Sequence, residues 1–144
     1  MTDSPSSVSS ERKAILLIDG HTSDRLYYAE CLKVSSPEYA VFQTINGQAG
    51  LDICNAHRID CVVLELELPD MSGFNVLAKL NSLGRRPDMA IIILTRLDNQ
   101  VLLEGALMMG ARFSLRKSLT SKDLLSKTIS SVLQVRGPLH RVAS

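Results

Sequence analysis

The stretch Asp60-Cys61-Val62-Val63-Leu64-Glu65-Leu66-Glu67-Leu68-Pro69-Asp70-Met71-Ser72-Gly73 decides the fold of this chain. Its apolar first half predicts a strand over Asp60 to Leu66 that is buried on both faces. This strand leads to one carboxylate, Glu65, and the chain then breaks at Pro69 and Gly73. A carboxylate at the end of a buried strand, beside a loop, is how α/β proteins present a reactive group.

Similar apolar runs lie before and after this strand, and helical patterns separate them. Further strands are expected over 14–19, 39–45, 89–95 and 111–115. Helices are expected from Thr22 or Ser23 to before Pro37, from Asn46-Gly47 to about Ala56, from Ser72 to about Leu83, over 97–109, and from a Thr120 cap to Gln134. The alternation predicts βαβ crossovers and therefore a parallel five-stranded sheet between two layers of helices.

The first helix is expected to pack on the sheet through one apolar stripe. That stripe is assigned to Leu26, Ala29, Cys31, Leu32 and Val34.

The composition bounds the class of protein. A chain of 144 residues, 45% hydrophobic and 22% charged, fits one globular domain. Sixteen basic and fifteen acidic residues give a net charge of +1, which argues against a nucleic-acid or membrane-surface domain. The chain has an odd number of cysteines, Cys31, Cys54 and Cys61, and their spacing is not that of a metal site. They are therefore predicted to be buried, reduced thiols.

The ends of the chain differ in composition from its centre. Residues 1–13 are polar and rich in serine, so they are expected to form a disordered leader and not a signal peptide. The folded domain is assigned to residues 14–135, and residues 136–144 to a tail or the start of a linker. No apolar run approaches the length of a membrane span, so a cytoplasmic protein is expected.

Polar side chains follow several of the predicted strands. Asp19, Glu65, Thr95 and the pair Arg116-Lys117 all fall at strand ends. Because parallel strands end at the same edge of a sheet, these residues are expected to converge in a crevice there.

With these motifs in order, the chain resembles the receiver domain of two-component response regulators from Ala14 to Gln134. The segments that carry the resemblance are Ile15-Leu16-Leu17-Ile18-Asp19 with Arg25, the Asp60-to-Gly73 stretch, Ile91-Ile92-Ile93-Leu94-Thr95, Gly110-Ala111-Arg112, and Leu115-Arg116-Lys117. The resemblance implies a flavodoxin-like (βα)5 three-layer sandwich with strand order 2-1-3-4-5.

The resemblance also implies roles for the residues of the crevice. In the family, an acidic pair after the first strand binds Mg²⁺, and an aspartate ending the third strand accepts phosphate from a histidine kinase. A hydroxyl residue ends the fourth strand and a lysine follows the fifth, and both contact the phosphoryl group. Asp19, Thr95 and Lys117 match the first acid, the hydroxyl residue and the lysine.

Two positions of the site depart from the family pattern. Gly20 stands where the second metal-binding acid is expected, and Glu65, one methylene longer than aspartate, stands at the phosphoacceptor. Mg²⁺ needs near-octahedral oxygen ligands, so binding through Asp19 and Glu65, with or without Glu67, is expected to be weak at best. No cofactor is therefore expected.

Three further positions differ from the family. Arg96 replaces a small residue, Ser114 replaces an aromatic switch residue, and Ser118 replaces a proline. Glu67 is interpreted as a solvated loop acid, with a role in a rescued cation site as the alternative. His21 is interpreted as a polar loop residue, with metal ligation or phosphoryl transfer as the alternatives.

These departures favour a pseudo-receiver, without enzymatic activity, that binds signalling proteins. The preferred interpretation of Glu65 is an ion pair with Lys117 or Arg96; the alternative is a mimic of phospho-aspartate that fixes an active state. A functional receiver with an atypical acceptor and a nucleotide-binding domain are the rival classes. The expected contact face for a histidine kinase, an output module or a second copy comprises the helix over 97–109, the strand over 111–115 and the helix over 120–134.

Overall fold

The computed structural model describes residues 12–82, 84 and 87–134. In chain order its elements are β1 (Ala14–Ile18), α2 (Thr22–Ser35), β2 (Ala40–Thr44), α3 (Gly47–Ala56), β3 (Cys61–Leu64), α4 (Gly73–Ser82), β4 (Ala90–Thr95), α5 (Gln100–Met108), β5 (Phe113–Arg116), a 3₁₀ turn (Lys117–Leu119) and α6 (Lys122–Gln134). All strand pairs are parallel, and the sheet order is β2-β1-β3-β4-β5. The predicted flavodoxin-like topology is confirmed.

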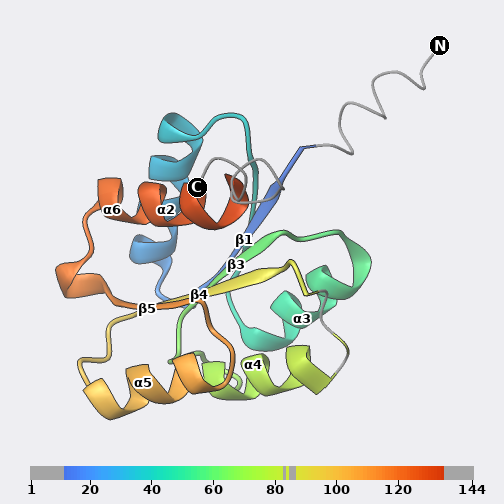
Figure 1. Ribbon diagram of the computed structural model, residues 1–144, viewed down its shortest axis with the longest axis vertical. Coiled ribbons are helices and arrows are strands. Elements are labelled where there is room, and N and C mark those ends of the chain that lie inside the picture. Colours follow the sequence, from blue (N-terminus) through green and yellow to red (C-terminus); the bar gives the residue numbers. More distant parts are fainter. Residues whose placement is uncertain (1–11, 83, 85–86, 135–144) are drawn as a thin grey trace, which may run out of the picture.

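The sheet lies between two layers of helices (Figure 1). Helices α2 and α6 cover one face, and α3, α4 and α5 cover the other. The strands β1, β3 and β4 are buried along their whole length, because alternate side chains enter the two separate cores. One core contains Leu16, Leu64 and Ile93, and the other contains Ile15, Val63 and Ile92.

The buried stripe of α2 differs from the predicted one. Arg25, Tyr28, Ala29 and Leu32 are buried, a spacing of i, i+3, i+4 and i+7 that follows one helix face. Leu26 and Val34, which were assigned to the stripe, are 51% and 72% exposed. The prediction from the apolar pattern was wrong because the buried face of α2 includes a charged residue, Arg25. The Arg25 guanidinium donates to the main-chain oxygen of Asp19 at 2.9 Å.

The last helix begins later than predicted. Thr120 is not its cap, because the 3₁₀ turn precedes it and the Thr120 hydroxyl donates to the main-chain oxygen of Arg116 at 2.7 Å. The Ser121 hydroxyl accepts the N–H of Leu124 instead, at 3.0 Å. This turn occupies the segment directly after β5, so it fixes where Lys117 leaves the sheet.

The first described residues are anchored to the domain. Arg12 lies in the range predicted to be a disordered leader, yet its guanidinium donates to the main-chain oxygens of Pro37, Glu38 and Tyr39. The Lys13 carbonyl accepts the N–H of Ala40 at the start of β2. These contacts hold Arg12 and Lys13 against the segment that leads into β2. The predicted leader over 1–11 and the predicted tail over 136–144 lie outside the described residues.

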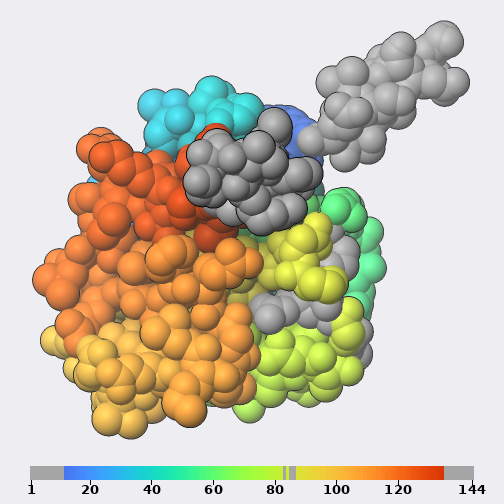
Figure 2. All heavy atoms as spheres, in the orientation of Figure 1, coloured from blue at the N-terminus to red at the C-terminus, as the bar shows by residue number. Residues whose placement is uncertain are grey.

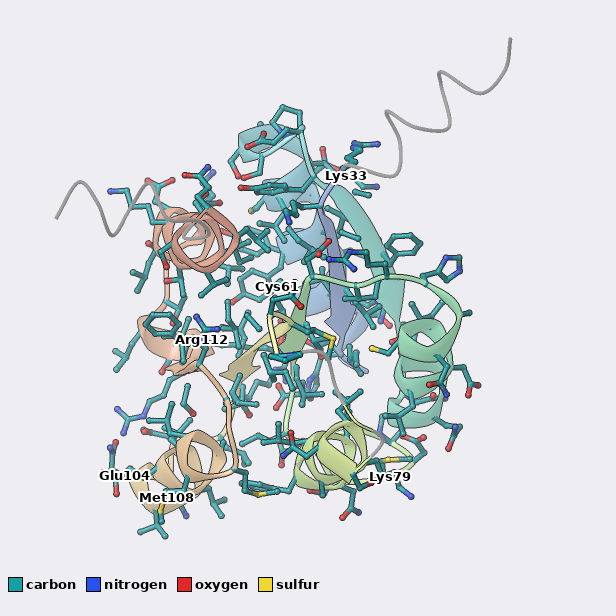
Figure 3. The ribbon with its side chains drawn as sticks, turned by 45° about the vertical axis from the view of Figure 1, so that its right-hand side comes forward. Lys33, Cys61, Lys79, Glu104, Met108 and Arg112 are labelled. Atoms are coloured by element: carbon teal, nitrogen blue, oxygen red, sulfur yellow. The ribbon has the colours of Figure 1, made fainter. Side chains whose placement is uncertain are left out.

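The three cysteines are free thiols, but only Cys61 is buried. Cys31 and Cys54 are half-buried, so the prediction of buried thiols is wrong for these two. Burial raises the pKa of Cys54 to about 11 and that of Cys61 to about 12. Figure 3 places Cys61 among the strands of the sheet, and its side chain belongs to the core between the sheet and helices α2 and α6. Both thiols are therefore protonated at neutral pH and unreactive. Among the described residues, none of the helices is both long and apolar enough to cross a bilayer.

Candidate functional site

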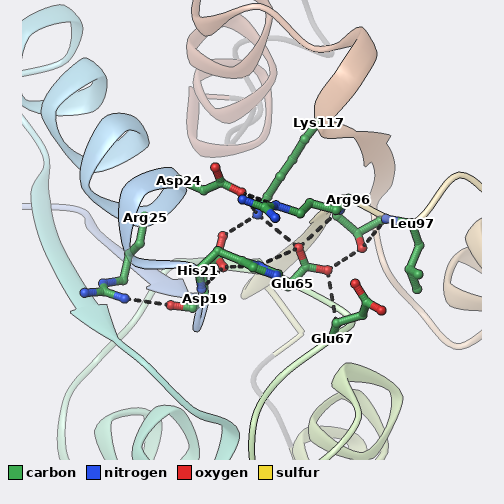
Figure 4. Close-up of polar contacts among 10 residues, drawn as sticks. Asp19, His21, Asp24, Arg25, Glu65, Glu67, Arg96, Leu97 and Lys117 are labelled. Carbon is green, nitrogen blue, oxygen red and sulfur yellow. Dashed lines mark hydrogen bonds and ion pairs between the residues drawn. The ribbon is translucent and has the colours of Figure 1, made fainter.

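Glu65 lies directly after β3 at the carboxyl edge of the sheet, and its side chain is fully enclosed. Its two oxygens accept four hydrogen bonds in all. Oε2 accepts from the Thr95 hydroxyl and from the N–H of Glu67 at 3.1 Å. Oε1 accepts from the N–H of Arg96 at 3.2 Å and from Lys117 at 3.0 Å. Figure 4 shows the carboxylate at the centre of these contacts.

The protonation of Glu65 follows from these contacts. Burial alone would raise its pKa, but the hydrogen bonds from Thr95 and Glu67 and the contact with Lys117 outweigh burial, so the pKa is lowered. Glu65 is therefore ionised at neutral pH.

Lys117, from the 3₁₀ turn after β5, reaches three carboxylates at once. Its ammonium lies 2.7 Å from Asp19 Oδ2, 2.8 Å from Asp24 Oδ2 and 3.0 Å from Glu65 Oε1. Burial favours the neutral amine, but the three acids outweigh it and the pKa of Lys117 is raised. The predicted pairing of Lys117 with Glu65 is present, within a larger cluster.

Asp24 is the functional residue that sequence reasoning missed. It lies in the first turn of α2, and its Oδ2 accepts from Lys117 and from Arg96 Nε, each at 2.8 Å. The hydrogen bond from Arg96, opposed by burial and helped by Lys117, lowers the pKa of Asp24 to about 2. The contacts also correct the prediction for Arg96: its guanidinium pairs with Asp24, and it reaches Glu65 through its main-chain N–H. The linear sequence contains no signal for this role, because it depends on side-chain pairing with Lys117 and Arg96 across the crevice.

Asp19 and His21 occupy the loop between β1 and α2. Asp19 Oδ1 accepts the N–H of His21 at 2.9 Å and lies 3.1 Å from His21 Nδ1. The same ring nitrogen lies 3.6 Å from Glu65 Oε1. His21 is thus part of the site and not only a polar loop residue.

The residues at the crevice do not fit the Mg²⁺ ion that the resemblance implies. Both oxygens of Asp19 are already held, one by Lys117 and the other by His21. Gly20 offers no side-chain oxygen, and Glu67 is exposed and reaches the site through its main-chain N–H. An octahedral cation needs charged oxygens that are free to converge on it.

Gly20 is also constrained by its neighbours. A Cβ at this position would lie 2.8 Å from Pro69 Cδ and 3.1 Å from the main-chain oxygen of Ile45. The ring of Pro69 therefore occupies space that a side chain at position 20 would need.

Ser114, the predicted switch position, lies on β5 away from Glu65. Its hydroxyl is buried, and no partner for it is found among the described residues. It lines a hollow of about 230 Å³ between α5 and α6, together with Leu103, Leu107, Leu119 and Leu124. The small side chain leaves this hollow open.

A parallel sheet of order 2-1-3-4-5 with an acidic pocket at its carboxyl edge defines the class of flavodoxin-like α/β domains. Within that class, the family model described as the response regulator receiver domain matches residues 15–129. The chain belongs to this family and is a receiver domain of a two-component response regulator.

Curated relatives and solved structures agree with this assignment. The chain is 26% identical over 122 residues to the cyclic di-GMP phosphodiesterase response regulator RpfG of Xanthomonas campestris, covering 85% of this chain and 32% of that protein. It is 29% identical over 117 residues to the nitrate/nitrite response regulator protein NarL of Escherichia coli, covering 80% and 52%. It thus spans about a third to a half of these relatives.

A solved structure of a CheY-like response regulator receiver domain protein from Methanospirillum hungatei superimposes with a TM-score of 0.73 at 25% identity. The match covers 85% of this chain and 94% of that one. Receiver domains of this family interact with histidine kinases and output domains.

Proposed function

We propose that this receiver domain is not phosphorylated by the usual aspartyl route and relays signals through protein–protein contacts. The observation that carries the proposal is that both carboxylate oxygens of Glu65 already accept hydrogen bonds from neighbouring groups. Its two oxygens accept from four donors. A cavity of about 10 Å³, which Glu65 lines together with Asp19 and Arg25, is no larger than one water molecule, so an incoming phosphoryl group would have to displace existing contacts.

Positioning and charge neutralisation govern phosphoryl transfer, and both are altered here. The ammonium of Lys117 is shared among three carboxylates and is not free to contact an incoming phosphate. The side chain of Glu65 extends further than an aspartate would. The oxygens of Asp19 and Glu65 are already held by other groups and do not fit a Mg²⁺ ion. The domain therefore acts by presenting a surface and has no enzymatic step of its own.

The proposal predicts that acetyl phosphate with Mg²⁺ leaves the chain unmodified. A transfer would place the phosphoryl group on a Glu65 oxygen and release acetate, and intact-protein mass spectrometry would record the added mass. We expect no adduct and no saturable NMR shifts at Glu65 with beryllofluoride. The matched variant is Glu65→Asp, which shortens the side chain in the same site. A labile adduct on wild-type Glu65 would overturn the proposal in favour of a functional receiver.

One observation favours the alternative, a permanently active state in which Glu65 mimics phospho-aspartate. The Thr95 hydroxyl and the Lys117 ammonium both contact Glu65, and the resemblance assigns these two groups to a bound phosphoryl. The carboxylate carries one negative charge and two oxygens, whereas a phosphoryl group carries about two charges and three oxygens. The structural ion pair is therefore the preferred role.

The face formed by α5, β5 and the start of α6 is the proposed contact surface. Figure 2 presents this region in gold to orange as one continuous surface, and Figure 3 shows Glu104 and Met108 pointing outward from α5. Apolar side chains are exposed across it: Val101, Leu107, Met108, Phe113, Leu119 and Leu124. Exposed apolar groups gathered on one face indicate an interaction site.

We expect the chain to self-associate through this face, and sedimentation velocity over a concentration series measures it. The double variant Met108→Asp with Leu119→Asp places charges on the face and should remain monomeric. The variant Val34→Asp, on the exposed side of α2, is the matched control and should associate as wild type does. Glu65→Gln tests the mimic: association weakened by Glu65→Gln supports a phospho-aspartate mimic, and unchanged association leaves Glu65 structural.

A further inference from the structure

The hollow that Ser114 lines between α5 and α6 has the size of a single substituted ring. Its volume is about 230 Å³. Pockets that bury a drug-sized ligand measure roughly 300–1,000 Å³, whereas an apolar cavity of about 150 Å³ already binds benzene. The hollow therefore has room for one benzene ring with a small substituent, and a nucleotide would be too large for it.

Leucine side chains form the walls of this hollow. They come from α5, β5, the 3₁₀ turn and the start of α6, and β5 lies between the two helices at the edge of the sheet (Figure 1). The inner wall includes Leu103, which is buried, but Leu107, Leu119 and Leu124 are 45%, 68% and 43% exposed. Removing apolar surface from water is favourable, so contact with these leucines would stabilise a bound hydrocarbon ring.

One polar group lies in this apolar setting without a partner. The Ser114 hydroxyl oxygen is buried, and among the described residues no hydrogen-bond partner for it is found. A hydroxyl both donates and accepts, and leaving it unpaired in an apolar environment is unfavourable. A ligand with a hydroxyl group of its own would satisfy Ser114, whereas a plain hydrocarbon would not.

The polar groups at the rim of the hollow bind one another. The amide nitrogen of Gln100 donates to Glu104 Oε2 at 2.9 Å, and its amide oxygen accepts from Arg116 Nη2 at 2.7 Å. The Thr120 hydroxyl donates to the main-chain oxygen of Arg116. The charges of Glu104 and Arg116 offset each other, so the rim favours neither an anion nor a cation. A neutral ligand therefore fits this hollow best.

We propose that the hollow between α5 and α6 binds a small neutral phenol, an aromatic ring that carries one hydroxyl group. The ring would contact the leucines, and its hydroxyl would form a hydrogen bond with Ser114. The small side chain of Ser114 leaves the space that the ring needs. This inference goes beyond the proposed function and does not depend on it, since it concerns a small-molecule ligand and not phosphorylation or a protein partner.

The test is an NMR titration of the full chain with phenol, at a protein concentration at which sedimentation velocity finds a monomer. We expect saturable shifts at Ser114, Leu103 and Leu124. Ser114→Ala should weaken phenol binding by about threefold to tenfold, the usual loss for one hydrogen bond, and should not weaken benzene binding. Ser131→Ala changes an exposed serine of α6 outside the hollow, so this matched control should bind phenol as wild type does.

Ser114→Phe tests the hollow itself, because a ring attached to β5 at this position would occupy the same space. This variant should lose phenol binding, and its urea denaturation verifies that it folds. Four results would overturn the proposal: no saturable shift with phenol, shifts only outside the hollow, equal phenol affinity in Ser114→Ala and wild type, or unchanged phenol binding by folded Ser114→Phe. Neither phosphorylation nor self-association is measured here, so failure of this test is distinct from failure of the proposed function.

Discussion

Replacing Lys117 with methionine is expected to lower the free energy of unfolding by about 3–5 kcal/mol at neutral pH. The Lys117 side chain is 8% exposed, and its ammonium is the shared cation of Asp19, Asp24 and Glu65. Methionine keeps the length and apolar stem of the side chain but leaves three carboxylates facing one another. The loss therefore comes from uncompensated negative charge and not from a cavity. Urea denaturation of wild type and variant measures the difference.

The pH dependence of this difference has a defined sign. The pKa of Lys117 is raised, so its stabilisation is complete below its usual pKa of 10.5 and is lost as pH rises through the folded pKa. The pKa of Glu65 is lowered, so its contribution is present above its usual value of 4.5 and is lost as pH falls through the folded pKa. The difference in free energy of unfolding between Lys117→Met and wild type should be largest between pH 4.5 and pH 10.5, and it should become smaller in acid.

Lys127→Met is the matched control for Lys117→Met, because Lys127 is exposed on α6. It should change the free energy of unfolding by less than about 0.5 kcal/mol. If Lys117→Met were as stable as this control at pH 7, Lys117 would not stabilise the domain by offsetting the charges of the three carboxylates.

Gly73→Ala is expected to destabilise the domain by about 2–3 kcal/mol, because the added methyl group meets rigid backbone. A Cβ at this position would lie 2.6 Å from the main-chain oxygen of Glu65 and 2.7 Å from Leu66 Cα. Neither atom can rotate away, so the start of α4 must move from the end of β3. The N–H of Gly73 donates to the carbonyl of Leu66 at 2.8 Å, and this bond would be strained as well.

Gly105→Ala is the control, and it is expected to stabilise the domain where Gly73→Ala destabilises it. This glycine lies inside α5, and its nearest neighbour to an added Cβ is Phe74 Cε1 at 4.0 Å. Alanine favours helix and reduces the entropy of the unfolded chain, so a gain of about 0.5–1 kcal/mol is expected. Thermal denaturation of both variants measures the contrast. Equal stability of Gly73→Ala and wild type would show that the close approach at Glu65 is not rigid.

The parallel sheet followed from the sequence because the apolar runs before Asp19, Glu65 and Thr95 are uninterrupted and contain β-branched residues, whereas the strand order followed only from the resemblance to receiver domains. Such runs have one stable placement, buried between two helix layers. The α2 stripe did not follow, since burial there is set by the Arg25 guanidinium bonding to a strand end, a tertiary contact with no apolar signature. The late start of α6 likewise depends on the 3₁₀ turn after β5.

The convergence of Asp19, Glu65, Thr95 and Lys117 was predictable, because parallel strands end at one edge. The partner of Arg96 was not. Side-chain pairing across the crevice depends on rotamers and on where the first turn of α2 places Asp24, and a linear pattern contains neither. His21 was underrated for the same reason: its ring direction follows from the hydrogen bond between its N–H and Asp19.

The contact between Gly20 and Pro69 bears on how the site could be redesigned. An aspartate at position 20 would require the loop after β3 to shift, since its Cβ would lie 2.8 Å from Pro69 Cδ. A designer who wants a second acid in this crevice would therefore have to change Gly20 and Pro69 together.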